Sequence, residues 1–113
     1  MAKIGGNITG LLQAKNGFEK NSIGEKIPKW ETSNELWGFL DFMGQNTSNT
    51  RNNFKTKLED STHIFICDYQ KLDKKAENKR MIVDEEVYDV LLIDDPMGLH
   101  EHIEIYLKYV GGQ

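Results

Sequence analysis

The sequence predicts a mainly β protein, a small closed or partly open antiparallel β-barrel of about six strands with long loops. Three observations predict this class. Apolar and polar residues alternate in the C-terminal half, turn residues separate short apolar runs, and no long helical period or internal repeat occurs. Short strands with turn signals fit a small sandwich or a barrel, and a barrel is favoured because closure removes exposed strand edges.

The C-terminal half carries the strongest strand signals. Between residues 102 and 109 every second residue is apolar, which is the spacing of a half-buried strand. Residues 87–93 are rich in β-branched and aromatic side chains and predict a more fully buried strand. Residues 94–98 contain Pro and Gly and predict the turn between these two strands. Residues 80–83 are expected to join residues 87–93 in a hairpin through the acidic turn at 84–86.

Three further strands are expected nearer the N-terminus. Residues 62–69 predict one strand, residues 36–42 predict another that is apolar on both faces, and a third lies around residues 8–14. Gly38 suits a bulge or a sharp bend, which small barrels need in order to turn corners. Residues 16–26 are expected to be irregular because they contain several Gly and Asn residues.

Two polar segments predict loops. Residues 44–57 have one central apolar residue, Phe54, so they cannot bury enough surface to order themselves. The chain 1–113 is therefore expected to be one barrel domain with a mobile loop at 44–58. Residues 70–79 are the second loop, which is either a solvated hairpin loop or a phosphate contact. Its possible DNA contacts are Lys71, Lys74 and Lys75.

Composition limits the function. Fourteen Lys and Arg against eighteen Asp and Glu give a net charge of −4, which argues against gripping nucleic acid by bulk charge. Cys67 is the single cysteine, so the sequence predicts no internal disulfide, no Cys-rich zinc site and a buried thiol in a cytosolic protein. No apolar run approaches the ~20 residues of a membrane span, and no signal peptide is expected.

Residues with catalytic or metal-binding chemistry form no persuasive group. His100 and His102 are two apart and would share one face of a strand, but no third ligand has a demanding spacing. Asp94 and Asp95 fit turn chemistry better than acid–base catalysis. Neither Ser61 nor Cys67 gains nucleophile geometry from its distance to His63 along one strand. We therefore expect no catalytic residue, no cofactor and no bound metal.

Several short motifs occur in the order and spacing of a known family. They are Ile8-Thr9, Lys29-Trp30-Glu31 and the segments 37–44, 60–69, 87–90, 93–97 and 102–108. From about Ile8 to Val110 the chain resembles the small head-closure proteins of siphophages and related prophage elements. These are also called stopper, head–tail joining or minor capsid proteins. Each motif is short, so the resemblance depends on their order, their spacing and the total length.

The resemblance implies a head–tail connector. Such a β-barrel forms a homo-oligomeric ring under the portal and adaptor proteins, continues the DNA channel and joins the tail. It implies transient passage of DNA without sequence-specific binding, no membrane, and a place in the virion neck after a period in the host cytoplasm. A net-negative subunit agrees with this, because a conduit that held DNA tightly would stall ejection.

In that family a long loop after the early strands reaches into the channel and can close it. The matching channel loop here is residues 45–57, whose polar and basic side chains are expected to line the channel. The named candidates are Gln45, Asn46, Thr47, Asn49, Arg51, Asn53 and Lys55. The contact between subunits is expected on the two-sided apolar segment, at Trp37, Phe39, Phe42 and Met43.

Two other functions remain open. The first is a free-standing barrel that binds a peptide or single-stranded nucleic acid, with Tyr69, Tyr88 and Tyr106 exposed on the sheet to stack on bases. The second is a small metal-dependent enzyme built on His100 and His102, for which the pattern is weakest.

Overall fold

The computed structural model describes residues 3–43 and 60–112. These residues form six strands and one short 3-10 helix. In chain order they are β1 (Ile8–Lys20), β2 (Lys26–Phe42), β3 (His63–Asp68), β4 (Lys79–Val83), β5 (Glu86–Asp94), η1 (Pro96–Gly98) and β6 (His102–Gly112). The predicted mainly β class is confirmed.

The six strands close into one antiparallel barrel in the order β1-β2-β3-β6-β5-β4. The ring is closed where Gly10–Ala14 of β1 pair with Val83–Lys79 of β4. The longest pairing in the body of the barrel joins β5 to β6 and contains two register shifts. Such irregularities increase local bending, which a closed six-stranded sheet requires.

The core is formed by alternate residues that point into the barrel. β3 shows the alternation well, because Phe65 and Cys67 are fully buried while their neighbours are only half-buried. Burial, together with the smaller effect of the nearby Asp68 carboxylate, raises the pKa of the Cys67 thiol to about 11. The largest fully buried side chains are Leu12, Leu36, Phe65, Met81, Ile103, Ile105 and Leu107.

Gly38 marks a place where three stretches of backbone approach closely. A methyl group in place of its hydrogen would lie 2.2 Å from the carbonyl oxygen of Ile66, and one on Gly6 would lie 2.5 Å from the Gly38 nitrogen. The backbone amide of Asn7 donates to the Gly38 carbonyl at 2.8 Å. The register of β2 does not shift at Gly38, so the expected bulge is wrong. Glycine is required there for close approach.

The N-terminal segment that crosses Gly38 is fastened to β3. The backbone amides of Ile4 and Gly5 donate to the two carboxylate oxygens of Asp68, at 2.7 and 3.1 Å. This explains how residues before the first strand follow the outside of the barrel.

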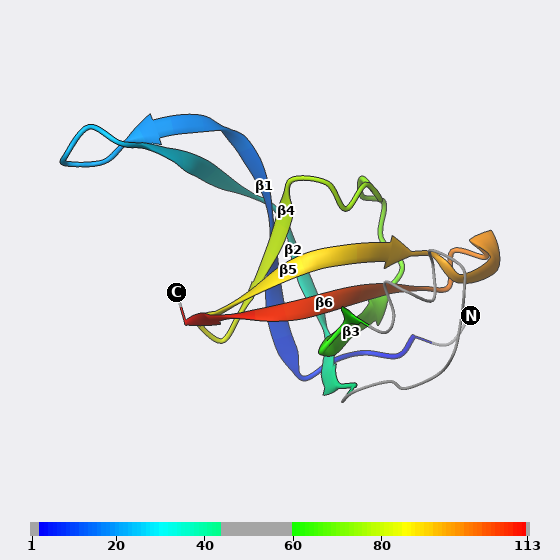
Figure 1. Cartoon of the computed structure of the whole chain (residues 1–113). Coiled ribbons are helices and arrows are strands. Elements are labelled where there is room, and N and C mark those ends of the chain that lie inside the picture. The colour runs from blue at the N-terminus through cyan, green and yellow to red at the C-terminus, as the bar shows by residue number, and fades with distance from the viewer. Residues whose placement is uncertain (1–2, 44–59, 113) are drawn as a thin grey trace.

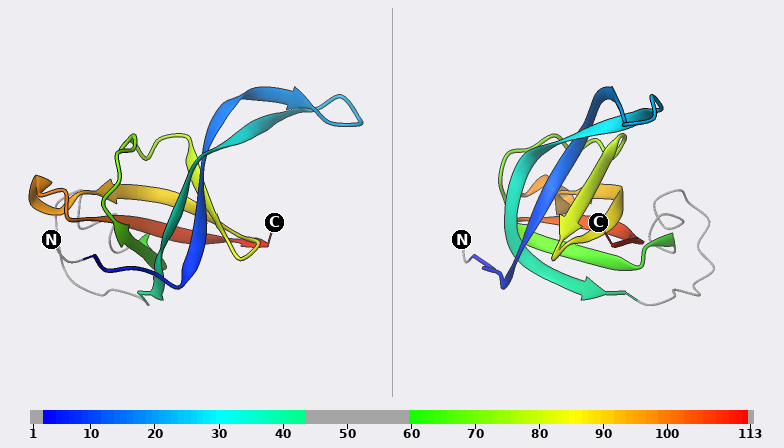
Figure 2. Two further views of the ribbon diagram at one scale, coloured as in Figure 1. Left: turned by 180° about the vertical axis from the view of Figure 1, so that it is seen from behind. Right: turned by 90° about the vertical axis from the view of Figure 1, so that its left-hand side faces the viewer.

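The main departure from the predicted fold is a β-hairpin that projects from the barrel (Figure 1). Residues 16–26 were expected to be irregular, but β1 continues to Lys20 and β2 begins at Lys26 rather than at residue 36. We call residues 15–31 the arm. Its strands pair only with each other, because the pairing of β1 with β4 ends at Ala14. The arm leaves the barrel in every view and makes the molecule 48 Å long (Figure 2).

The tip of the arm is a loop organised by Asn21. Its side-chain oxygen accepts the backbone amides of Ile23 and Glu25, at 3.1 and 2.9 Å. Gly24 takes a positive φ of 85°, which glycine adopts without strain. The Gly and Asn residues that suggested irregular chain therefore form the turn of a hairpin.

The predicted hairpin between β4 and β5 is confirmed. Its turn residues, Asp84 and Glu85, both have positive φ, at 51° and 66°. Two consecutive positive values are those of a type I′ turn, whose twist matches the flanking strands. Positive φ is strained for residues with a Cβ atom, and the dipeptide Asn-Gly adopts this turn more readily.

Candidate interaction surfaces

The outward side of the β2–β3 pair carries an apolar surface, which we call the outer patch. It contains Trp37 and Phe39 of β2, and Ile64 and Ile66 of β3. Trp37 is 56% exposed, whereas Phe39 is half-buried. Leu36 and Gly38 are buried on the inward face of β2, so the outward positions 37 and 39 are not needed for the core. Two of the four expected subunit contacts, Trp37 and Phe39, thus lie on one outer face.

The other two expected contacts lie where β2 ends. Phe42 is 74% exposed, and its ring meets the His63 ring edge-on at 5.4 Å. The backbone amide of Met43 donates to the Thr62 carbonyl at 2.8 Å. The His63 ring also contacts Tyr88 at 5.1 Å, and burial lowers its pKa. Phe42, His63 and Tyr88 thus form an aromatic cluster beside the end of β2.

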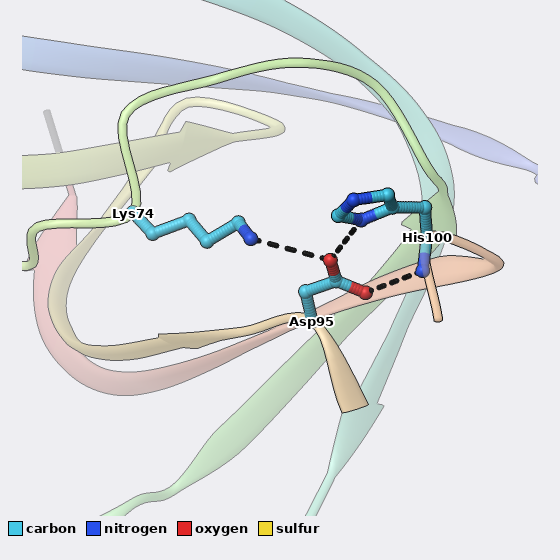
Figure 3. Close-up of polar contacts among 3 residues, drawn as sticks. All are labelled: Lys74, Asp95 and His100. Carbon is cyan, nitrogen blue, oxygen red and sulfur yellow. Dashed lines mark hydrogen bonds and ion pairs between the residues drawn. The ribbon is translucent and has the colours of Figure 1, made fainter. Parts of the chain in front are cut away.

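A buried carboxylate, Asp95, joins two loops at the end of the barrel where β5 finishes (Figure 3). Its side chain is only 2% exposed. It accepts the backbone amide of His100 at 3.0 Å and contacts the Nδ1 atom of the same residue. Lys74 donates from the other side at 3.2 Å. Burial opposes ionisation of Asp95, but the hydrogen bonds from His100 and Lys74 outweigh it and hold the pKa of the carboxyl below its usual value.

This arrangement is structural. The turn that follows Asp95 contains positive φ at Met97, Gly98 and His100, so it needs an anchor. The Asp95 carboxylate provides that anchor and also ties the 70–79 loop to the turn. The neighbouring Asp94 lies on β5, where it is opposite Glu104 of β6 in the register of the sheet. The two carboxylates have different surroundings, as expected for a turn.

The three lysines predicted as DNA contacts have unequal surroundings. Lys74 is engaged with Asp95, so its charge is largely neutralised. Lys71 and Lys75 are exposed, and the backbone amide of Lys75 donates to the Asp73 carboxylate at 3.1 Å. The nearby Lys79 ammonium also binds Asp73, at 2.9 Å. The loop therefore presents two unshielded lysines.

The histidines do not converge. His100 stacks on Tyr69 in the turn, with ring centroids 4.5 Å apart, whereas His102 pairs with Glu104 at 3.0 Å. In the pairing of β3 with β6, His102 lies opposite Asp68, and His63 lies opposite Leu107. His63 and His102 are therefore separated by five strand positions, roughly 17 Å. Within residues 3–43 and 60–112, no three His, Cys, Asp or Glu side chains are grouped to hold a metal ion.

The tyrosines expected to stack on bases are not exposed. Tyr88 belongs to the barrel core, Tyr106 is also buried, and Tyr69 is half-buried against the core. The expectation of an open aromatic platform is therefore wrong for this sheet. The whole proposed channel loop, residues 45–57, lies outside the described residues.

Sequence reasoning missed the groove at the base of the arm. Arg80 of β4 is fixed there, because its Nε donates to Gln13 at 2.7 Å and its guanidinium lies 4.6 Å from the centre of the Trp30 ring. Beside Trp30 opens a groove of about 430 Å³, which we call the arm-base groove. It is lined by Trp30, Ala76, Glu77, Asn78, Lys79, Asp89, Val90 and Leu91. The available signal for the strand beside it was the short run Lys29-Trp30-Glu31-Thr32, in which charged residues alternate with tryptophan and threonine.

Fold and surfaces define a small all-β protein, a closed six-stranded barrel with a projecting hairpin arm. No helix in the described part of the chain is long and apolar enough to cross a membrane.

Comparison with known proteins gives a likeness to a solved structure. No family model matches the chain, and no curated protein matches it. Among solved structures, it is similar to a chain of the "Virion of native gene transfer agent (GTA) particle", with a TM-score of 0.52 and 11% sequence identity. The alignment covers 94% of this chain and 96% of that chain. At this identity the likeness shows a shared fold, which extends over nearly the whole of both chains.

Proposed function

We propose that this protein is a non-enzymatic structural subunit of a phage or phage-like virion. Its place is the neck, where copies form a ring that continues the DNA channel and joins the portal and adaptor to the tail. The observation that carries the proposal is the end-to-end fold likeness to a chain of a gene transfer agent virion. The motif order from Ile8 to Val110 supports the same conclusion independently.

Surface properties support assembly with other copies. A barrel with an apolar outer patch around Trp37 and Phe39 has surface suited to a subunit contact. The net charge of −4 suits a channel that lets DNA pass without retaining it. We assign the channel lining to residues 45–57, which follow β2 in the sequence. Lys71 and Lys75 are the candidates for passing contact with DNA.

Particles from cells that carry the gene test this proposal. The expected result is that the protein copurifies with particles and that antibody to it labels the junction of head and tail. Cells that lack the gene should accumulate filled heads without tails, and a plasmid copy should restore joining. Label spread over the capsid shell or along the tail, or absence of the protein from particles, would contradict the neck assignment.

A matched pair of variants tests the subunit contact. Trp37→Ser should fail to restore joining because it removes the exposed centre of the outer patch. Glu101→Ser, an exposed change in the turn before β6 and outside both the outer patch and the arm, should restore it fully. Equal activity of the two variants would remove the outer patch from the interface.

A further inference from the structure

The tip of the arm is apolar although it points into solvent. Ile23 is 76% exposed and Phe18 is 58% exposed, and Ile27 is also exposed. A two-stranded ribbon is only marginally stable by itself, and these side chains pack against no other element of the described fold. Exposed apolar side chains gathered on a projection mark a contact with a partner.

The arm-base groove offers a surface of matching size and character. Trp30 and Ala76 form its walls, and Val90 and Leu91 of β5 line it from the barrel. A groove of about 430 Å³ accepts one or two aliphatic side chains. The groove is part of the described barrel and does not depend on residues 44–59.

Charge distinguishes the two surfaces. Residues 15–31 contain four lysines and three glutamates, a net charge of +1, so the remainder of the chain carries −5. At the groove, Glu77 and Asp89 are exposed and form no ion pair within the described residues, while Lys79 is held by Asp73.

At the arm tip the charges are divided between the two faces of the ribbon: Glu19 lies opposite Ile27 on one face, Lys20 and Lys26 lie on the other face with Phe18, and Glu25 is in the turn. Lys20 and Lys26 face each other across the hairpin and form no ion pair in the part of the chain that the structure covers. Two unpaired lysines on the same face as Phe18 match two unpaired carboxylates beside an apolar groove.

The arm cannot fill the groove of its own molecule. Trp30 is both the base of the arm and a wall of the groove, whereas Ile23 lies at the far end of the ribbon (Figure 1). Folding the tip back would break the pairing of β1 with β2. If the arm tip binds in such a groove, the groove must therefore belong to another molecule.

We propose that the arm tip of one copy docks in the arm-base groove of the next copy. The contact is head-to-tail, because one copy contributes its tip and the other its groove. Repetition of a head-to-tail contact closes into a ring when the rotation between copies allows it. The inference rests on the proposed function for the closed ring, and the docking of two copies can be tested without it.

Engineered cysteines test the contact directly. The double variant Ile23→Cys/Leu91→Cys places one thiol on the tip and one in the groove. The buried Cys67, whose pKa is raised to about 11, stays unreactive at pH 8. Mild oxidation with diamide at about 1 mM protein, where even a contact of millimolar Kd is populated, should give a ladder of dimers, trimers and longer species on a non-reducing gel.

Controls make the ladder specific. Each single-cysteine variant can give at most a dimer. The matched double variant Ile23→Cys/Glu101→Cys, with its second thiol in the exposed turn before β6, should give at least tenfold less of the species beyond the dimer. An equal ladder from this control, or no ladder from a folded Ile23→Cys/Leu91→Cys protein, overturns the docking proposal.

The two proposals fail in different ways. If the ladder forms but the protein is absent from particles, the docking stands and the neck assignment fails. If particles contain the protein at the neck but the cysteine pair gives no ladder, the neck assignment stands and the docking fails.

Discussion

The barrel and the arm are made of the same two long strands, yet they are stabilised in different ways. Within the barrel β1 has two neighbouring strands and its inward side chains are fully buried, as Leu12 shows. In the arm the same strand has one neighbour, and Phe18 lies in solvent beneath the Lys15 ammonium. The comparison teaches that the body is stabilised by burial, whereas the arm is held by local pairing and leaves its apolar side chains exposed.

Replacing one phenylalanine by alanine in each region should give the largest difference in the free energy of unfolding. Phe65→Ala empties a fully buried site in the barrel and should lower the free energy of unfolding by about 4 kcal/mol. Phe18→Ala should change it by less than about 0.5 kcal/mol because the ring is exposed in the arm. Chemical denaturation of both variants measures the difference. Similar losses would mean that the arm is part of the cooperative fold.

The close approach at Gly38 gives the next effect. Gly38→Ala should cost about 3 kcal/mol, because the added methyl meets the backbone of Ile66, which cannot move as a side chain could. Gly24→Ala, at the arm tip, has open space around it and should cost about 1 kcal/mol from its positive φ alone. Thermal unfolding of the pair should rank them in this order. The reverse order would contradict the crossing at Gly38.

Asp95 should show a pH-dependent effect in the barrel that no arm residue shares. Its folded pKa is lowered, so its stabilisation is complete above the ordinary carboxyl value of about 3.9 and is lost as pH falls through the folded value. Asp95→Ala should therefore lower the Tm by several degrees at pH 7 and by less near pH 3. Glu31→Ala in the arm is the control and should be neutral. A constant difference at both pH values would mean that the carboxylate charge is not what stabilises the turn.

The β4–β5 turn offers a small gain. Asp84→Asn/Glu85→Gly should stabilise the barrel by about 0.5–1 kcal/mol, because Asn-Gly adopts two successive positive φ values with less strain. Denaturant titration measures the gain. A loss instead would indicate that the acidic side chains of the turn contribute more than their strained backbone costs.

The difference between the two regions also explains what the sequence could predict. Alternation of apolar residues identified β6, and runs rich in β-branched and aromatic residues identified β3 and β5, because those strands bury side chains in the core. The arm has no buried face, so residues 16–20 and 26–31 carry no sustained apolar alternation, although they are regular strand. The tip residues Asn21 and Gly24 gave a correct turn signal, which we assigned to irregular chain.

The candidate surfaces were predicted in part for the same reason. Trp37 and Phe39 could be predicted as surface residues because a strand that is apolar on both faces has more apolar side chains than one core can bury. The arm-base groove could not be predicted, because Trp30, Ala76 and Leu91 come from three separate segments that only the closed sheet brings together. The Asp95 anchor likewise depends on Lys74 reaching across from another loop.

The composition of the arm also protects the molecule from indiscriminate self-association. A bare ribbon edge invites any extended chain to add itself as a further strand, which is a route to aggregates. Here Pro28 removes one backbone donor, the irregular pairing between Lys15 and Phe18 interrupts the ladder, and Lys20, Lys26 and Lys29 repel similar edges. Molecules at high concentration before the proposed assembly can thus keep their arms extended without aggregating through the strand edges.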